Sequence, residues 1–224
     1  DNRSSSGIGG GLFVNSHDNL QVQDSAFNNN RAQNGAGIAI AATLSNPASA
    51  AISRSSLTNN IASNQGGGIF VDEYGLELEN VTLSGNSASA GGGAYMQGFG
   101  ASQRLNFVTV ANNSGNGLVT DTDTSVSSSN TLFVGNAANN CVDLSTASVT
   151  TESISSDATC PGSTQFTTTQ INVDALANNG ANTLTHALLP GSVAIDAVPG
   201  GSCNNFSGDP IGEDQRGSTV GPRP

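Results

Sequence analysis

The sequence predicts an all-β fold of the parallel β-helix class, in which the chain winds into a solenoid and each repeat forms one coil. A glycine cluster opens an apolar segment five times, and an apolar residue is followed three places later by asparagine five times. Successive copies lie 23 to 31 residues apart, by subtraction of their residue numbers. Periods of roughly 20–50 residues are typical of solenoids and other repeat folds. The segments contain Val, Ile, Leu and Phe between Gly, Asn and Ser and lack helical periodicity, which favours coils made of short strands.

The glycine clusters are expected to stack at one turn of successive coils. They read GGGLFV, GAGIAI, GGGIFV, GGGAYM and, in degenerate form, GNGLVT. Their first residues are Gly9, Gly35, Gly66, Gly91 and Gly115. Glycine forms turns that a Cβ atom would forbid, and it allows one backbone to approach another closely.

The second repeated feature is the asparagine that follows each apolar residue. The pairs are Phe27 with Asn30, Leu57 with Asn60, Leu83 with Asn86, Val110 with Asn113, and Phe133 with Asn136. Asparagine at a bend tolerates left-handed backbone geometry and can hydrogen-bond to the same residue one coil away. We therefore predict a ladder of these five asparagines. A disordered chain, the alternative for an Asn- and Gly-rich sequence, would not keep an apolar residue in register with each of them.

The body of the solenoid is expected over residues 1–140, as about five coils. Apolar residues five places before each apolar anchor should point inward, and their polar neighbours should point outward, as the two faces of a strand require. The inward residues are Val22, Ile52, Leu78 and Leu105.

The same alignment predicts two ion pairs on the outer surface. It places Arg54 one coil beyond Asp24, and Arg104 one coil beyond Glu77. Neighbouring strands lie about 4.8 Å apart, so each arginine should reach the carboxylate beside it. Such exposed pairs contribute about 0–1 kcal/mol each.

The two ends of the chain differ from the body. Asn2 stands in the ladder position, so the chain is expected to begin within a coil and to be a segment of a longer protein. Residues 141–169 lose the repeat and are expected to form irregular final coils. Residues 170–224 concentrate proline and alternate extended segments with turns, and they are the expected C-terminal cap. A solenoid end needs a cap because it exposes unpaired strand edges and an apolar cross-section.

Two family resemblances follow from these motifs. The repeats resemble those of polymorphic outer membrane proteins, although Leu or Val replaces Phe in the middle coils. The tail is similar to the choice-of-anchor Q domain of secreted bacterial proteins, although Val193 stands where that family usually has proline and the loop over residues 199–213 is expanded. The segments that carry this second resemblance are LANNG from Leu176, THALLPGS from Thr185, AIDA from Ala194, DQRG from Asp214 and the final PRP.

The resemblances imply a right-handed parallel β-helix that is exported to the extracellular space or the bacterial cell surface, with an anchoring or sorting segment after this chain. They imply no catalytic residues. In an exported protein, Cys141 and Cys160, which lie 19 residues apart, are expected to form a disulfide worth about 3 kcal/mol. Cys203 is then either free or a competitor for one of the other two.

Composition excludes some classes of partner. The formal net charge is −11, and all six basic residues are arginine. Nucleic acid and anionic membrane surfaces are not expected as partners, because both require clustered positive charge. No segment approaches the roughly 20 apolar residues of a transmembrane helix, so direct membrane insertion of this segment is not expected.

The tail holds the most notable polar residues. His186 is interpreted as a hydrogen-bonded residue of the cap, with a general base or a metal ligand as the alternative. Asp196, Asp214 and Arg216 form either a recognition clasp or a group that pins loop backbone through charge-assisted hydrogen bonds. No cofactor is expected. Calcium is the alternative, at Asp121-Thr122-Asp123 or at the acids over residues 209–214, but neither has the spacing of a known calcium loop.

Three functions fit this architecture. The favoured one is a non-catalytic structural or adhesive module of the cell surface, which could assemble end to end and contact other copies of itself, envelope or matrix proteins, or glycans. The second is a polysaccharide lyase or hydrolase acting on acidic glycans, with candidate acids Asp72 and Glu73 or Glu77 and Glu79. The third is glycan binding without cleavage, for which the candidate aromatic residues are Tyr74, Tyr95 and Phe99.

Overall fold

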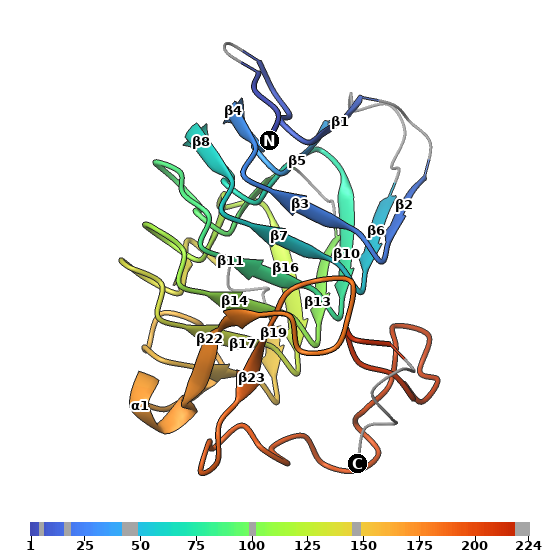
Figure 1. Ribbon diagram of the computed structural model, residues 1–224, viewed down its shortest axis with the longest axis vertical. Helices are drawn as coiled ribbons and strands as arrows, with labels where there is room; N and C mark the ends of the chain where they lie inside the picture. The colour runs from blue at the N-terminus through green and yellow to red at the C-terminus, as the bar shows by residue number, and fades with distance from the viewer. Residues whose placement is uncertain (5–6, 16–18, 42–48, 99–101, 145–148, 218–224) are drawn as a thin grey trace.

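The computed structural model describes residues 1–4, 7–15, 19–41, 49–98, 102–144 and 149–217, and it confirms the predicted solenoid of parallel strands (Figure 1). Three parallel sheets run along the body, and successive coils add one strand to each. Sheet 1 contains β1 (Leu12–Asn15), β5 (Ile38–Ala41), β9 (Ile69–Asp72), β12 (Ala94–Gln97), β15 (Leu118–Thr120) and β18 (Cys141–Val142). Sheet 2 contains β2 (Leu20–Gln23), β6 (Ser49–Ser53), β10 (Gly75–Glu79), β13 (Ser102–Asn106), β16 (Ser125–Ser129) and β19 (Val149–Thr151).

Sheet 3 and a short fourth sheet complete each coil. Sheet 3 contains β3 (Ala26–Asn28), β7 (Ser56–Thr58), β11 (Thr82–Ser84), β14 (Thr109–Ala111), β17 (Leu132–Val134), β20 (Ile154–Ser155) and β21 (Thr164–Gln165). The short sheet pairs β4 (Arg31–Asn34) with β8 (Ile61–Gln65). Because sequence repeats fix the register, equivalent residues of successive coils lie side by side.

The core is a column of aliphatic side chains, as the repeat predicts. Phe27, Leu57, Leu83, Val110 and Phe133 pair in register along sheet 3. The predicted inward column of sheet 2 pairs in the same way. Its members are Val22, Ile52, Leu78 and Leu105, of which the last three are fully buried. The strands of sheet 2 therefore direct alternate residues into the core and turn the others outward.

The asparagine ladder lies at the bend that follows sheet 3. Its members are Asn30, Asn60, Asn86, Asn113 and Asn136, all of them buried. At each step the side-chain Nδ2 donates to Oδ1 of the asparagine one coil on, at 2.9–3.1 Å. The backbone N–H donates to the same Oδ1 at 2.9–3.0 Å. Asn2 extends the ladder by donating to Asn30. These bonds satisfy buried amide groups that water cannot reach.

One detail of the ladder differs from the prediction. The left-handed backbone belongs to the residue before each ladder asparagine, with φ of 54–67°. These residues are Asn29, Asn59, Gly85, Asn112 and Gly135. The expectation that the ladder asparagines themselves adopt this geometry is wrong. The preceding residue makes the bend, so the ladder asparagine can direct both its backbone N–H and its side chain along the solenoid axis.

The five repeated glycines all have positive φ, between 60° and 92°, which explains why each turn begins with glycine. They are Gly9, Gly35, Gly66, Gly91 and Gly115. The third residue of a cluster is restricted for another reason. A Cβ atom on Gly37 would lie 2.5 Å from the carbonyl oxygen of Gly68 in the next coil. The coils approach too closely there for any side chain.

The tail lies along the side of the solenoid (Figure 1). It comprises α1 (Thr168–Ile171) and an antiparallel hairpin of β22 (Val173–Ala177) and β23 (Thr185–Leu188). Ile171 and Val173 pack with Ala111, Val134 and Ile154 of sheet 3. Whereas a cap over the last coil was expected, these contacts place the tail on the outer face of sheet 3. The apolar outward residues of the later coils, which the tail buries, explain this position.

Candidate functional site

The outward face of sheet 2 presents two columns of polar and small side chains. One column contains Gln21, Ala51, Glu77, Arg104 and Ser127 in register. The other contains Gln23, Ser53, Glu79, Asn106 and Ser129. They face outward because the residues between them fill the core.

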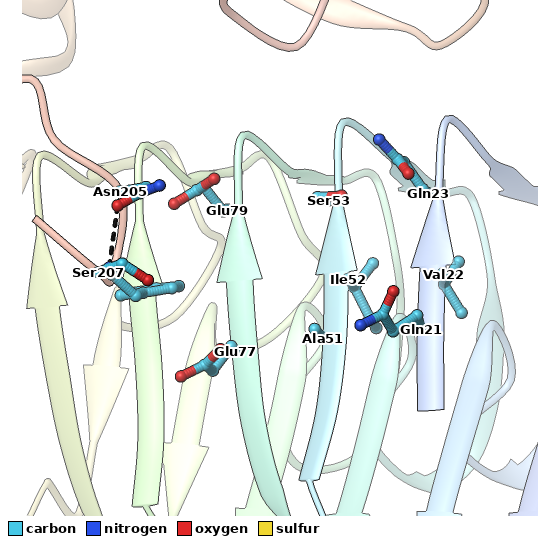
Figure 2. A pocket seen from close by; sticks show the side chains of 11 residues that line it. Gln21, Val22, Gln23, Ala51, Ile52, Ser53, Glu77, Glu79, Asn205 and Ser207 are labelled. Carbon is cyan, nitrogen blue, oxygen red and sulfur yellow. Dashed lines mark hydrogen bonds between the residues drawn. The ribbon is translucent and has the colours of Figure 1, made fainter. Parts of the chain in front are cut away.

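The columns are interrupted at β6 by a depression that we call the trough (Figure 2). Its volume is about 260 Å³. Ala51 and Ser53 form its floor, because their side chains are shorter than those on the neighbouring strands. Its walls are the two glutamines of β2 and the two glutamates of β10, with residues 205–207 of the tail beside β10.

The tail loop is held against this wall by Arg104. The guanidinium of Arg104 lies 4.2 Å from the ring centroid of Phe206, and its Nη2 donates to the carbonyl of Phe206 at 3.3 Å. Its Nη1 contacts Oε1 of Glu77 at 2.8 Å, so the predicted pair is formed. Asn106 adds a hydrogen bond from Nδ2 to the carbonyl of Asn204 at 2.8 Å. Stacking and charge-assisted bonds therefore fix the wall before any ligand arrives.

The predicted Asp24–Arg54 pair lies at the end of the trough where β6 ends. Nε of Arg54 contacts Oδ1 of Asp24 at 2.8 Å, and its Nη2 donates to Oδ2 at 2.9 Å. These hydrogen bonds lower the pKa of Asp24 and raise the pKa of Arg54. Glu213 of the tail lies 3.9 Å from the same guanidinium. Arg54 is therefore occupied by carboxylates of the protein.

The two glutamates share one wall of the trough. Glu77 and Glu79 are two residues apart on β10, which separates their Cα atoms by about 7 Å. Gln21 and Gln23 stand on the opposite wall. Glycoside hydrolysis uses two carboxyl groups that flank the scissile bond, one of them as an acid. A sugar lying in the trough would meet carboxylates on one side and amides on the other, an arrangement suited to binding hydroxyl groups.

His186 makes a contact that the sequence did not reveal. Its Nε2 lies 2.8 Å from Oγ of Ser84, and its Nδ1 lies 2.7 Å from the carbonyl of Asp174. Because a carbonyl only accepts, Nδ1 must donate, which leaves Nε2 to accept from the hydroxyl of Ser84. Ser84 is only 2% exposed, whereas His186 is half-buried. Both ring nitrogens of His186 are engaged by groups of the protein. His186 ties the tail hairpin to sheet 3.

The other singled-out tail residues separate into two groups. Arg216 and Asp214 form a close ion pair at 2.6 Å, and Oδ1 of Asp214 also accepts from the backbone N–H of Arg216. This hydrogen bonding raises the pKa of Arg216. Asp196 lies exposed in a turn with φ of 54°. The ion pair between Asp214 and Arg216 therefore holds its own loop in place, which is the second of the two roles considered for these residues.

A second depression, of about 450 Å³, lies between the tail and sheet 3. His186, Asp214, Gln215 and Arg216 line it from the tail. Gln215 bridges the two parts, since it accepts from Thr82 at 2.7 Å. The side chains that line this depression also join the tail to the body, which favours a structural role.

No group of three or more His, Cys, Asp or Glu side chains is placed to hold a metal ion among the described residues. At the first candidate calcium segment, the carboxylate of Asp121 accepts from the backbone N–H of Gly98 and from the hydroxyl of Thr124. These bonds close a turn within the protein.

The aromatic residues lie elsewhere than predicted. Tyr74 is fully buried, Tyr95 stacks against Phe70 with ring centroids 6.1 Å apart, and Phe99 lies outside the described residues. Phe206, from the tail, is the aromatic residue at the trough. Its role had no signal in the sequence, because the repeat does not extend to residue 206.

The predicted disulfide between Cys141 and Cys160 is formed. Cys141 and Cys160 are bonded and belong to the core cluster, while Cys203 is a free thiol of intermediate exposure. No known protein family, curated protein or solved structure matches this chain. Within the described ranges, no helix is long and apolar enough to cross a membrane.

Proposed function

We propose that this chain is a non-catalytic, exported structural or adhesive module that presents the outer face of sheet 2 to a partner. The observation that carries the proposal is the trough, whose carboxylates share one wall while amides form the other. Oε1 of Glu77 is engaged by Arg104, so the acid pair that a hydrolase requires is poorly arranged. The ladder and the stacked sheets supply the rigid support that a binding face needs.

Export is supported by two observations. Disulfides form and persist in oxidising compartments, and Cys141 and Cys160 are bonded. The similarity of the tail to choice-of-anchor Q domains points the same way and favours the bacterial cell surface.

Self-assembly is a further part of the proposal. Among the residues that the structure describes, β1, β2 and β3 are the terminal strands of their sheets, and Phe13 of β1 is 45% exposed. Unpaired strand edges can pair with another chain, so another copy is one candidate partner. Sedimentation at rising protein concentration checks this, and a monomer at every concentration would count against it.

The test of the proposed function combines turnover and location. We expect no new reducing ends or unsaturated products from pectin, alginate or xylan, and we expect full-length protein to be accessible to protease on intact cells. The alternative function, a polysaccharide lyase or hydrolase, predicts product formation that Glu79→Gln abolishes. Such turnover, or protein confined to the cytoplasm, would overturn the proposal.

A further inference from the structure

The trough has the shape of a slot for one extended chain. Its two walls stand on β2 and β10, on either side of β6. Neighbouring strands lie about 4.8 Å apart, so the backbones of the walls are about 10 Å apart. An α-helix with its side chains is about 10–12 Å wide and does not enter between the wall side chains. A single strand of sugar rings, which is as thin as one layer of side chains, can lie along β6.

The wall chemistry suits hydroxyl groups. The glutamate wall contributes carboxylate oxygens of Glu77 and Glu79, although Oε1 of Glu77 is bound to Arg104. The amide of Gln21 can donate and accept. Asn205 and Gln23 offer mainly their NH₂ donors, because Oδ1 of Asn205 already accepts from two backbone N–H groups and the amide oxygen of Gln23 faces Arg54. Sugar hydroxyls donate and accept in the same way, so paired hydroxyls can bridge neighbouring wall groups. Phe206 adds an apolar ring at the rim. Its stacking on Arg104 holds the ring in place, which reduces the entropic cost of ordering it during binding.

A peptide fits the trough less well. One common way for a peptide to bind a sheet is to add a strand at an edge, whereas the trough lies on a face between paired strands. Most of the binding energy at protein interfaces comes from a few large side chains that fill well-packed, desolvated pockets. The floor here presents the methyl group of Ala51 and the hydroxymethyl group of Ser53, while the side chains of the bordering residues Val22 and Ile52 pack into the core.

The charges at the trough exclude a polyanion. The walls carry the two carboxylates of Glu77 and Glu79. Arg104 is paired with Glu77, and Arg54 is paired with Asp24. The whole chain carries a formal charge of −11, which repels an acidic polymer at long range.

We infer that the trough binds one chain of a neutral glycan, which lies along β6 between the glutamine wall and the glutamate wall. This inference rests on the proposed non-catalytic function and names the ligand class of its site. The sugar hydroxyls bond to the wall side chains, and one ring packs against Phe206. Binding involves no bond cleavage and requires no metal ion.

The register of sheet 2 offers a matched pair of variants for the test. Ala51→Gln fills the floor with a side chain that the same column already accommodates at Gln21. Ser127→Gln makes the same kind of change at an exposed position of that column, beyond Arg104 and outside the trough. Both changes leave the core untouched, so they should fold alike.

The experiment titrates the full chain with neutral hexasaccharides of glucose, mannose and xylose, and with the galacturonate hexasaccharide, by calorimetry and by amide chemical shifts. We expect a neutral hexasaccharide to bind, with shifts at β2, β6, β10 and residues 205–207. Ala51→Gln should weaken binding about tenfold or more, and Ser127→Gln by less than about twofold. Glu79→Gln should weaken it about tenfold, and added salt should have little effect.

Four results would overturn the inference. These are no binding of any neutral probe, tighter binding of the galacturonate probe, shifts located away from the trough, and equal effects of the two glutamine variants. Cleavage of a bound hexasaccharide would instead refute the proposed non-catalytic function while leaving the ligand class intact. If no neutral hexasaccharide binds and none is cleaved, the inference about the glycan ligand is refuted, whereas the proposed non-catalytic function is not.

Discussion

Replacing Asn86 by alanine tests whether the ladder stabilises the solenoid. The Asn86 side chain takes part in four hydrogen bonds. Its Nδ2 donates to the carbonyl of Leu57 at 2.9 Å and to Oδ1 of Asn113 at 3.1 Å. Its Oδ1 accepts from the backbone N–H and from Nδ2 of Asn60, both at 3.0 Å. All four bonds lie in the buried middle of the body.

The magnitude follows from the groups that lose their partners. The backbone N–H of Asn60 is buried, and it loses its bond to the Asn86 side chain in the variant. A buried donor without a partner costs about 1–3 kcal/mol, and each of the three other lost bonds contributes about 1 kcal/mol. We therefore expect Asn86→Ala to lower the free energy of unfolding by about 4–6 kcal/mol.

The assay is urea unfolding followed by far-UV circular dichroism. Asn2→Ala is the control, because Asn2 is exposed and its side chain makes a single ladder bond, to Oδ1 of Asn30. The control should cost less than about 1 kcal/mol. If Asn86→Ala and Asn2→Ala lower the free energy of unfolding by equally small amounts, the ladder is a consequence of the fold and does not stabilise it.

Three further predictions concern the charges, the disulfide and the glycines. Asp24→Asn removes the ion pair with Arg54, which contributes about 1 kcal/mol or less to the free energy of unfolding. Because Arg54 lowers the pKa of Asp24 in the folded state, this contribution is present above the unfolded-state pKa of about 3.9 and is lost as the pH falls through the lower folded-state value. Urea titrations at several pH values should show that the stabilities of the wild type and of Asp24→Asn converge in acid. Cys160→Ser should cost about 3 kcal/mol in the same assay, and a reductant should bring the wild type to the variant's level. Gly37→Ala should cost about 2 kcal/mol in thermal unfolding, because its Cβ would meet the next coil, whereas Gly212→Ala, with nothing within 4 Å of its Cβ, should cost less than about 0.5 kcal/mol.

The body could be predicted from the sequence because a solenoid converts sequence spacing directly into spatial neighbours. Once Leu83 is aligned with Val110, the register also places Glu77 beside Arg104, and both contacts are found. The one incorrect expectation about the ladder concerned which residue at the bend has left-handed backbone geometry, and it did not affect the arrangement of the coils. The residue that bends the chain is Asn59 in one coil and Gly85 in another, so the bend does not depend on a repeated residue type.

The tail could not be placed by the same reasoning. Its contacts join residues about 100 positions apart, such as Ser84 with His186 and Asn106 with Asn204, and no period relates them. The outward apolar pair Ala111 and Val134 was the available signal that something covers sheet 3, since outward residues of an exposed face would be polar.

The trough depends on both parts of the chain, and this explains why it escaped the sequence analysis. The repeat determines that Ala51 and Ser53 lie between longer side chains, which creates the slot. The tail adds Phe206 to the rim, where Arg104 holds it. A coil with short outward residues would alone be a shallow dip on a flat sheet, and the tail loop alone would have no partner wall. Arg104 contacts Glu77 on one side and Phe206 on the other, so the same side chain that closes the predicted ion pair also aligns the two halves of the proposed glycan site.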